Sequence, residues 1–575
     1  MLNRIYIIVG MLAIIVLAGA FIAPNFVRWS DYRGRMEELA TSVLGTPVTV
    51  RGEIDFTLLP QPRLRFSDVL VGSAEEPAAT VDSVEAEFSL MDFLRDNYTV
   101  TRLVLRQPVV DFSIDESGFF GSGVDLAAGT GGVGLGDTTI VGATVRLMDR
   151  RSGETFVAND VSGELRLADF SGPFSFQGSG SHGGEPYSLR FNSSALDVAE
   201  KSRISLFLQP QSGAFSLSFE GLLAPGMAPK FEGDMVYRQA PPATDVATDI
   251  RGDLALESKV TGSTDRIVLS GYTLRPDENR AGTRLTGAAS IQLGDVRSFD
   301  AVISGGVFAL PPRDAKEDAT TLPYEAVRLL TELPAPPMPP MAGRVGIDLA
   351  EVGLRGFALR NVRLDASTDG SIWQIEQFVG QLPGDTEVRA SGQLSSDNAR
   401  PAFRGDVSVS SARLDGLAAL WRKPDETNLL FNEPAALTGQ VMLGGDALGL
   451  VSGVLTLNER PHAVELRLGF GAEKRLDLVA HFDDLGERGS ALIGALLPNI
   501  GSEPEFGISF PDGSFSLTGK GARILGLDGT GLVAEGQWRG DGITFSRLSA
   551  EDWGGVGFDA VLTAGGTVGE PDVSG

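Results

Sequence analysis

The chain has 575 residues, of which 42% are hydrophobic and 21% charged, and its formal net charge is −27 at pH 7. This composition excludes an intrinsically disordered chain, and the length exceeds what one compact core accommodates. The negative charge disfavours nucleic acid as a partner, and the absence of cysteine excludes disulfides, cysteine-zinc sites and thiol catalysis.

The first predicted element is an uncharged apolar segment at residues 5–23. A segment of this length is sufficient to cross a bilayer core as a helix, and Trp29 follows where an interfacial aromatic residue is expected. A cleaved signal peptide is the alternative, but the apolar run exceeds a typical signal core. We therefore predict an anchor with a cytoplasmic stub at residues 1–29 and the body on the far side of the membrane. The arginines after the segment favour the opposite orientation.

Short helices are predicted next, separated by long stretches of another pattern. In the first of them apolar residues recur at helical spacing and Gly45 follows as a C-terminal cap. The predicted helices are Asp31–Leu44, Leu90–Leu94, Tyr324–Leu333, Leu414–Trp421 and Leu492–Leu497.

Almost all other segments alternate apolar and polar residues with period two, the pattern of half-buried antiparallel strands. Glycine, numbering 72, and other turn residues punctuate these runs. We predict a mainly β fold: an elongated, curled antiparallel sheet with a few short helices. The candidate residues for its apolar groove are Phe215, Leu217, Phe219, Val464, Leu466, Leu468, Leu476 and Leu478.

Two low-complexity segments suggest the division of the body. A Gly-rich linker is predicted at 121–137, between an α/β region at 30–120 and a groove segment at 138–332. The Pro-rich segment 333–342 is predicted to be an extended connector leading to groove repeats at 343–575. The chain ends on a strand-like unit, so we expect either a longer protein or a partner that covers the edge.

Several N-terminal stretches resemble the signature of the AsmA family. They are LGTPV (Leu44–Val48), RGEI (Arg51–Ile54), LLPQP (Leu58–Pro62) and FSDV (Phe66–Val69). The segment Ile140–Thr155 and the motif Phe170–Phe174 are similar to stretches of proteobacterial members. The resemblance covers roughly residues 2–180; beyond it, only the style of Gly-marked amphipathic strands is shared.

The resemblance implies an envelope protein anchored in the bacterial inner membrane with its body in the periplasm. It also implies kinship with TamB-like and other bridge-like lipid transfer proteins, whose curled sheet has an apolar interior. Their proposed task is to move phospholipid towards the outer membrane and to maintain that membrane. The family motifs are structural, so they assign no single functional residue.

The residue pattern is compatible with lipid carriage. An apolar sheet face must be covered, by a second sheet, by closure or by an apolar ligand. Many inward candidates are small, among them Ala86, Ala390, Gly392, Ala480 and Ala564. Acyl chains would be held by non-directional burial, about 0.8 kcal/mol per CH₂, so sliding along the face has little net cost.

Sequence motifs for catalysis, nucleotide binding or metal binding are weak along the whole chain. The Gly131–Gly136 run does not follow a strand, so it is a poor nucleotide fingerprint. Asp111, Asp115 and Glu116 lack the EF-hand spacing, and His462 with His481 lacks a third metal donor. No Walker A sequence and no G-x-S-x-G elbow occurs. We therefore expect no enzymatic activity, cofactor or metal.

Three functions compete at this point. The first is a lipid-handling scaffold that binds phospholipid acyl chains. The second is an adaptor for outer-membrane assembly that binds an envelope protein by strand addition. The third is a passive stalk, which requires a dry, filled interior.

Overall fold

The computed structural model describes the greater part of the body of the chain. The described residues are 29–73, 77–93, 95, 100–122, 135–167, 172–240, 254–276, 284–309, 329, 333, 335–354, 357–398, 400–420, 433–470, 474–496, 512–524, 526–539, 542–567 and 570–575. The predicted membrane anchor at 5–23 and most of the Gly-rich linker lie outside them. Within the described residues, no helix combines the length and apolarity that a membrane crossing requires.

The described chain is mainly β and divides into two compact units. The first unit comprises residues 1–242 with 253–274 and 289–297. Its helices are the 3-10 helix η2 (Trp29–Tyr32), α2 (Arg33–Leu44) and α3 (Leu90–Phe93). Its strands are β1 (Val48–Val50), β2 (Ile54–Thr57), β3 (Arg63–Gly72), β4 (Pro77–Phe88), β5 (Val100–Arg106), β6 (Val109–Ile114), β7 (Phe120–Gly121), β8 (Leu135–Asp149), β9 (Glu154–Leu167), β10 (Phe174–His182), β11 (Glu185–Ser193), β12 (Ser202–Pro210), β13 (Phe215–Ala224), β14 (Lys230–Gln239), β15 (Leu254–Gly262) and β16 (Arg266–Arg275).

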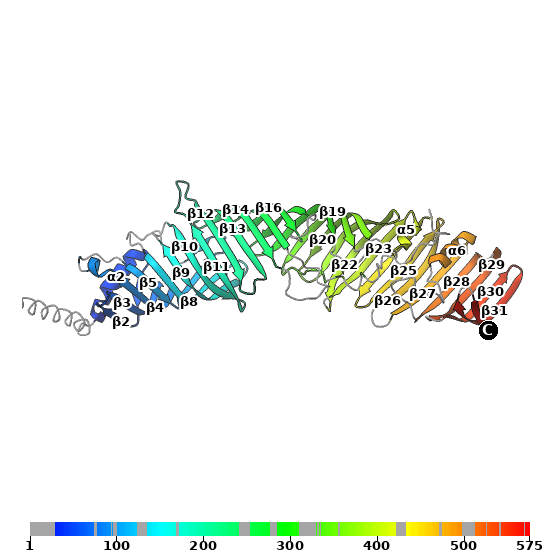
Figure 1. The fold of residues 1–575 in the computed structure, drawn as a ribbon, viewed down its shortest axis with the longest axis horizontal. Helices are drawn as coiled ribbons and strands as arrows, with labels where there is room; N and C mark the ends of the chain where they lie inside the picture. The colour runs from blue at the N-terminus through cyan, green and yellow to red at the C-terminus, as the bar shows by residue number, and fades with distance from the viewer. Residues whose placement is uncertain are drawn as a thin grey trace, which may run out of the picture. The chain divides into compact units, whose positions relative to one another are not determined.

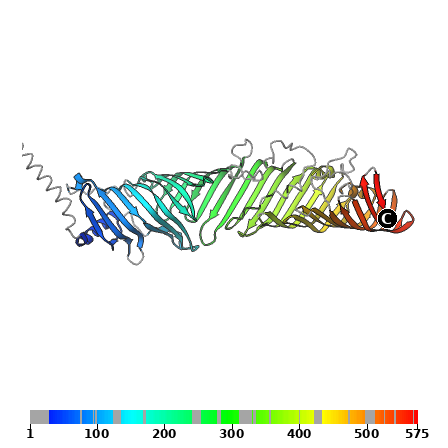
Figure 2. The ribbon, with the colours of Figure 1, turned by 60° about the horizontal axis from the view of Figure 1, so that its bottom comes forward.

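The second unit contains residues 243–252, 275–288 and 298–575, and β17 (Leu285–Gln292) is divided between the units. In Figure 2 its strands follow one another side by side from green to red. Its helices are α5 (Leu414–Ala418) and α6 (Glu487–Leu496). Its strands are β18 (Ser298–Ala309), β19 (Ala342–Leu354), β20 (Phe357–Thr368), β21 (Trp373–Leu382), β22 (Thr386–Asp397), β23 (Arg400–Ser411), β24 (Ala435–Gly444), β25 (Ala447–Leu457), β26 (Arg460–Phe470), β27 (Lys474–Leu485), β28 (Asp512–Ile524), β29 (Leu527–Arg539), β30 (Gly542–Trp553), β31 (Val556–Thr567) and β32 (Glu570–Ser574).

Most neighbouring strands are consecutive and antiparallel, as the alternating pattern predicts (Figure 1). The expectation of a purely antiparallel sheet is wrong, however. β5 and β6 pair with β8 in parallel, and so do β18 with β19 and β27 with β28. Each parallel pair follows a long connection, because parallel neighbours need a crossover instead of a hairpin.

The Pro-rich segment 333–342 is one of these crossovers. It lies in the connection from β18 to β19, and these strands pair within the second unit. In sequence, the two compact units meet around residues 242–298. The division of the body at residues 333–342 stays a prediction. A proline-rich segment lacks backbone donors for a sheet, so it suits a connection that runs outside the strand pairing.

The helix predictions are confirmed at four places. α2 ends at Gly45, whose φ is 70° and whose N–H donates to the Thr41 carbonyl at 2.8 Å, as a left-handed cap does. α3, α5 and α6 also form, with boundaries that differ by a few residues. The helix expected at 324–333 lies almost wholly outside the described residues.

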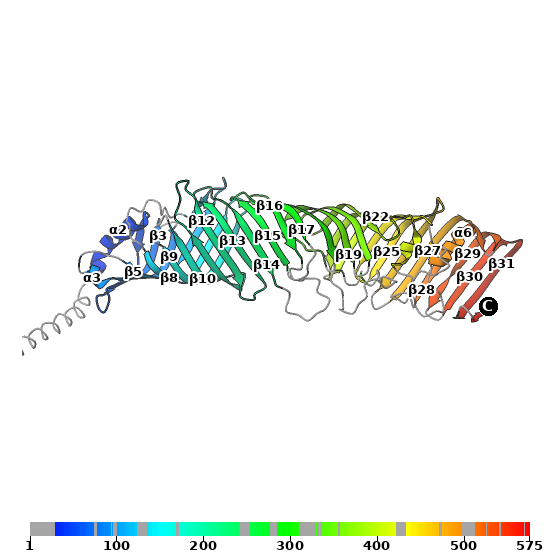
Figure 3. The same cartoon turned by 45° about the horizontal axis from the view of Figure 1, so that its top comes forward.

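Helices cover only parts of the apolar surface. α2 packs Met36, Ala40 and Leu44 against a buried cluster from β1 to β4 that includes Val50 and Val69. In the second unit, Leu414 and Ala418 of α5 pack with Leu492 of α6. α6 contacts β27 and β28, as Figure 3 shows. Glu433, which is buried, forms an ion pair with Arg488 of α6.

An ion cluster ties two distant turns of the first unit together. Arg151, in the β8–β9 turn, binds Asp149 with Nη2 at 2.8 Å and Asp265, in the β15–β16 turn, with Nη1 at 2.7 Å. Arg151 Nη2 also donates to the Thr264 carbonyl, and the side chain of Arg151 is only 6% exposed. The Arg151 hydrogen bond lowers the pKa of Asp149. Because β8 and β15 are not paired, this contact shows that the strands of the first unit are curled.

Replacing the buried cation should loosen this curl. Arg151→Met leaves Asp149 buried without its partner, which destabilises a protein by about 3–5 kcal/mol. We expect a lower urea midpoint and faster hydrogen exchange at residues 262–266. Arg146→Met is the matched control, because the Arg146–Asp111 pair is almost half exposed and such pairs contribute about 0–1 kcal/mol. Equal effects of the two variants would contradict the assigned role of Arg151.

Candidate functional site

A row of apolar side chains crosses the first unit on one face. Directly paired residues of antiparallel strands lie on the same face of a sheet. The register pairs Leu189 with Leu208, Leu208 with Leu217, Leu217 with Tyr237, and Tyr237 with Leu256. The face is therefore continuous from β11 to β15.

The second unit carries a corresponding row. The register joins, in order across six strands, Leu394, Phe403, Leu443, Leu448, Leu468 and Leu476. A second row runs beside it through Leu450, Leu466, Leu478 and Phe515. We refer to these surfaces as the apolar face of each unit.

The groove candidates from the sequence all lie on these faces. Phe215, Leu217 and Phe219 line the apolar face of β13. The other five are brought together across β26 and β27: Val464, Leu466, Leu468, Leu476 and Leu478. The structure thus places them as the alternation predicts, and their contact with lipid remains a prediction.

Much of the apolar face is only half-buried. Residues beneath α2, such as Val50 and Val69, are 4–5% exposed. By contrast Leu217, Leu466 and Leu478 are of intermediate exposure. A sheet face sealed by its own core would bury such side chains almost completely. These positions therefore retain apolar surface that a ligand could cover.

Several aromatic rings extend over glycines of the neighbouring strand. A Cβ at Gly262 would meet the ring of its pair partner Phe231 at 2.1 Å, and a Cβ at Gly343 would meet the ring of Phe299 at 2.2 Å. The absence of a side chain at Gly262 and Gly343 thus leaves room for these two rings.

The opposite face of the strands is polar, and this separates the two C-terminal histidines. His462 lies on the apolar face of β26, whereas His481 pairs with Ala463 on the other side. They cannot act as a pair of metal ligands. Among the described residues, no group of three or more His, Asp or Glu side chains is arranged to hold a metal ion.

His462 is the buried titratable group of the apolar face. It is 2% exposed, its ring lies 5.3 Å from that of Phe482, and its Nδ1 has no hydrogen-bond partner among the described residues. Burial lowers the pKa of His462, and the nearby carboxylates of Asp483 and Asp484 oppose this shift. The imidazole is therefore held in its neutral form within an apolar environment.

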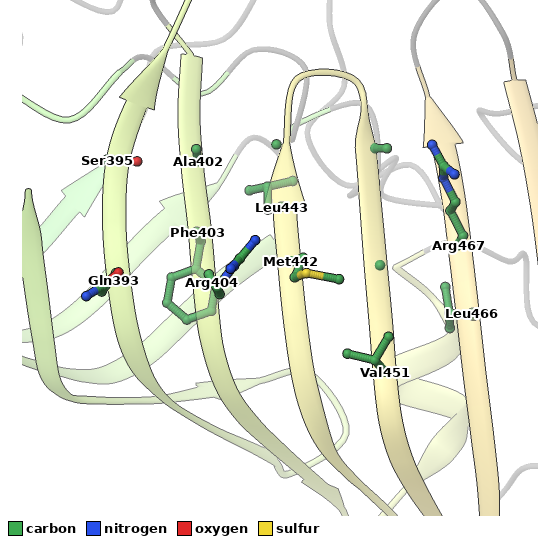
Figure 4. Close-up of a pocket in the computed structure, with 13 residues that line it drawn as sticks. Gln393, Ser395, Ala402, Phe403, Arg404, Met442, Leu443, Val451, Leu466 and Arg467 are labelled. Atoms are coloured by element: carbon green, nitrogen blue, oxygen red, sulfur yellow. The ribbon is translucent and has the colours of Figure 1, made fainter.

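A pocket of about 600 Å³ lies in the second unit, lined mostly by residues of the polar face, with Phe403, Leu443 and Leu466 of the apolar rows also contributing (Figure 4). One cross-strand row supplies much of its lining: Gln393, Arg404, Met442, Gly449 and Arg467. The sequence analysis missed this pocket. These residues come from five strands, and each occupies an ordinary outward-facing position in its own strand. No local sequence pattern therefore predicts that they line a pocket.

The apolar face presents hydrocarbon side chains that an apolar ligand could cover. Burial of acyl groups needs no directed polar contacts, and its strength scales with the area covered. Similar side chains recur from strand to strand, so a chain meets a similar surface at each step across the row. Such a face suits a guest that must be held without being fixed in place.

Comparisons with known proteins support the N-terminal resemblance. The model of the AsmA family matches residues 2–121. The similar stretches noted between residues 140 and 180 lie beyond this match. No curated protein and no solved structure gives a significant match to the chain.

Filling the space beneath an aromatic ring should disturb the apolar face. Gly262→Ala places a methyl group against the Phe231 ring and forces it to move, an overpacking that typically costs about 1–3 kcal/mol. We expect a lower thermal midpoint. Gly306→Ala in β18 is the control, since a Cβ there meets nothing within 4 Å. A midpoint unchanged in both variants would show that the ring does not depend on this glycine.

The burial of His462 should make stability depend on pH. The folded pKa is below the unfolded one, so the unfolded chain binds the proton first as the pH falls. The free energy of unfolding should be insensitive to His462 well above pH 6.5 and should fall below it, by at most about 1.4 kcal/mol per pH unit. His462→Phe should remove this contribution, measured by urea unfolding between pH 8 and 5. His481→Gln, at an exposed position of the next strand, should retain it.

Proposed function

We propose that the protein handles phospholipid, and the premise is the match of residues 2–121 to the model of the AsmA family. The acyl chains would lie along the apolar face of each unit. The observation that carries this proposal is the continuous row of apolar side chains from Leu394 to Leu476, all of them half-buried except Leu468, which is buried.

The physical argument is one of uncovered area. An acyl chain that lies against the row removes its own surface and that of the leucines from water, at about 25 cal/mol per Å². In this arrangement only the acyl chain contacts the apolar side chains. The head group stays in water and need not enter an apolar environment. Since similar contacts recur across the row, movement along it changes the free energy little. The proposal needs no catalytic residue, cofactor or metal.

The setting that we propose follows the family. Residues 5–23 would hold the chain in the bacterial inner membrane, and the two β units would stand in the periplasm. The protein would then support the outer membrane by moving or presenting phospholipid. Binding of an envelope protein by strand addition is the competing function, and the same experiment separates it.

Site-specific photo-crosslinking tests the proposal with a matched pair of positions. A photoreactive residue at Leu466, on the apolar face, should form adducts with phospholipid in intact cells, whereas one at Glu465, on the polar face of the same strand, should not. Leu217 and Ser218 form the equivalent pair in β13. Native mass spectrometry of the detergent-extracted protein should also detect bound phospholipid.

Two outcomes would contradict the proposal. Equal lipid labelling at Leu466 and Glu465 would indicate general contact with membrane and no selective face. Protein adducts without lipid at Leu466 would favour the strand-addition adaptor.

A further inference from the structure

The pocket of the second unit contains two arginines without a partner. Within the described residues, Arg404 and Arg467 form no ion pair or hydrogen bond with another side chain, and both are exposed. Most other arginines of the second unit are engaged, as in the Arg389–Glu387 and Arg475–Asp477 pairs. In a chain with net charge −27, two free cations in one pocket are unusual.

The register places the Cα atoms of both arginines at the border of a small-residue floor. Arg404 and Arg467 are three strands apart in one row, with Met442 and Gly449 between them. At about 4.8 Å per strand, their Cα atoms are about 14 Å apart, a gap that two extended arginine side chains largely span. Gly449 has no side chain, so the space beside Arg467 is open. In Figure 4 the Arg404 side chain extends towards Met442.

No carboxylate lines the pocket, but three carboxylates lie nearby on the polar face of the sheet. Asp406 and Glu465 each lie two residues along the strand from an arginine of the pair. Asp477 pairs in register with Arg467, but its carboxylate accepts hydrogen bonds from Arg475 Nε at 2.8 Å and from the Ser514 backbone N–H at 3.0 Å. The cations of the pocket are therefore not neutralised by direct contact.

The pocket also has an apolar part. Met442 is 38% exposed, and Val451 and Ala402 lie beside it in the lining. Gln393 and Ser395 complete the border with neutral polar groups. A ligand that fits must combine an anionic group with a short hydrocarbon part, and the volume suits a small molecule.

We propose that this outer pocket binds a phosphate monoester attached to a small apolar group, with the phosphate between Arg404 and Arg467 and the hydrocarbon against Met442. Guanidinium groups bind phosphate oxygens in a bidentate manner. A monoester carries a charge of about −1.5 to −2, which matches two cations, whereas a carboxylate matches one. Arg404, Met442 and Arg467 lie on the face opposite the apolar rows, although Phe403, Leu443 and Leu466 of those rows also contribute to the lining. The arginine variants therefore test this site separately from the phospholipid function proposed above.

Calorimetric titration of the detergent-solubilised full chain tests this site with butyl phosphate, inorganic phosphate and butyrate. Butyl phosphate should bind best, because it alone satisfies both parts of the pocket. Arg404→Gln and Arg467→Gln should each weaken it by about tenfold to a hundredfold, as expected for a lost hydrogen-bonded charge. Gly449→Leu should abolish binding while keeping both charges, since a Cβ there meets Met442 only at an ordinary 3.8 Å. Arg389→Gln, on the same face outside the pocket, is the control and should leave binding unchanged.

Flotation with vesicles identifies the source of the phosphate. Arginine-dependent binding to phosphatidic acid vesicles, and not to phosphatidylcholine vesicles, would assign the site to a lipid head group. Binding of butyl phosphate alone would assign it to a soluble ester. Equal affinity for butyrate, or unchanged affinity in both arginine variants with unaltered thermal midpoints, would overturn the proposal.

Discussion

The structure depends on one constraint: the two-residue alternation of each strand stays in register with that of its neighbours. A slip by one residue would move every leucine of a strand to the polar face. Hairpin pairing maintains the register across β22 to β27, so separate runs of alternating residues become one continuous surface. The apolar face therefore depends on how the strands pair, and no single strand forms it alone.

This constraint explains why so much of the fold follows from sequence. Period-two alternation is local, so the strands and the face of each groove candidate, such as Leu217 or Leu466, could be predicted residue by residue. Helix ends with a strong cap, as at Gly45, are local too. The parallel pairing of β18 with β19 is not a local property. The two strands are separated by a long connection, and the residues of neither strand indicate which neighbour it pairs with.

The same reasoning explains what remained hidden. The contact between Arg151 and Asp265 joins residues 114 positions apart and exists only because the first unit curls. Arg404 and Arg467 are ordinary exposed residues until three strand pairings place them in one row. Long-range electrostatic features of this kind depend on geometry that a single sequence does not encode in any recognisable motif.

The partly covered apolar face poses a stability problem that the proposed binding of lipid would resolve. Half-buried leucines in water would promote association between copies, since large exposed apolar patches mark interaction sites or aggregation hazards. Helices protect the face at α2 and near α5 and α6, where packing is dense. Elsewhere the Phe231 and Phe299 rings extend over Gly262 and Gly343, and side chains such as Leu217 and Leu466 stay half-buried. The proposed binding of an apolar ligand rests on this partial cover, because a ligand would remove the remaining apolar surface from water.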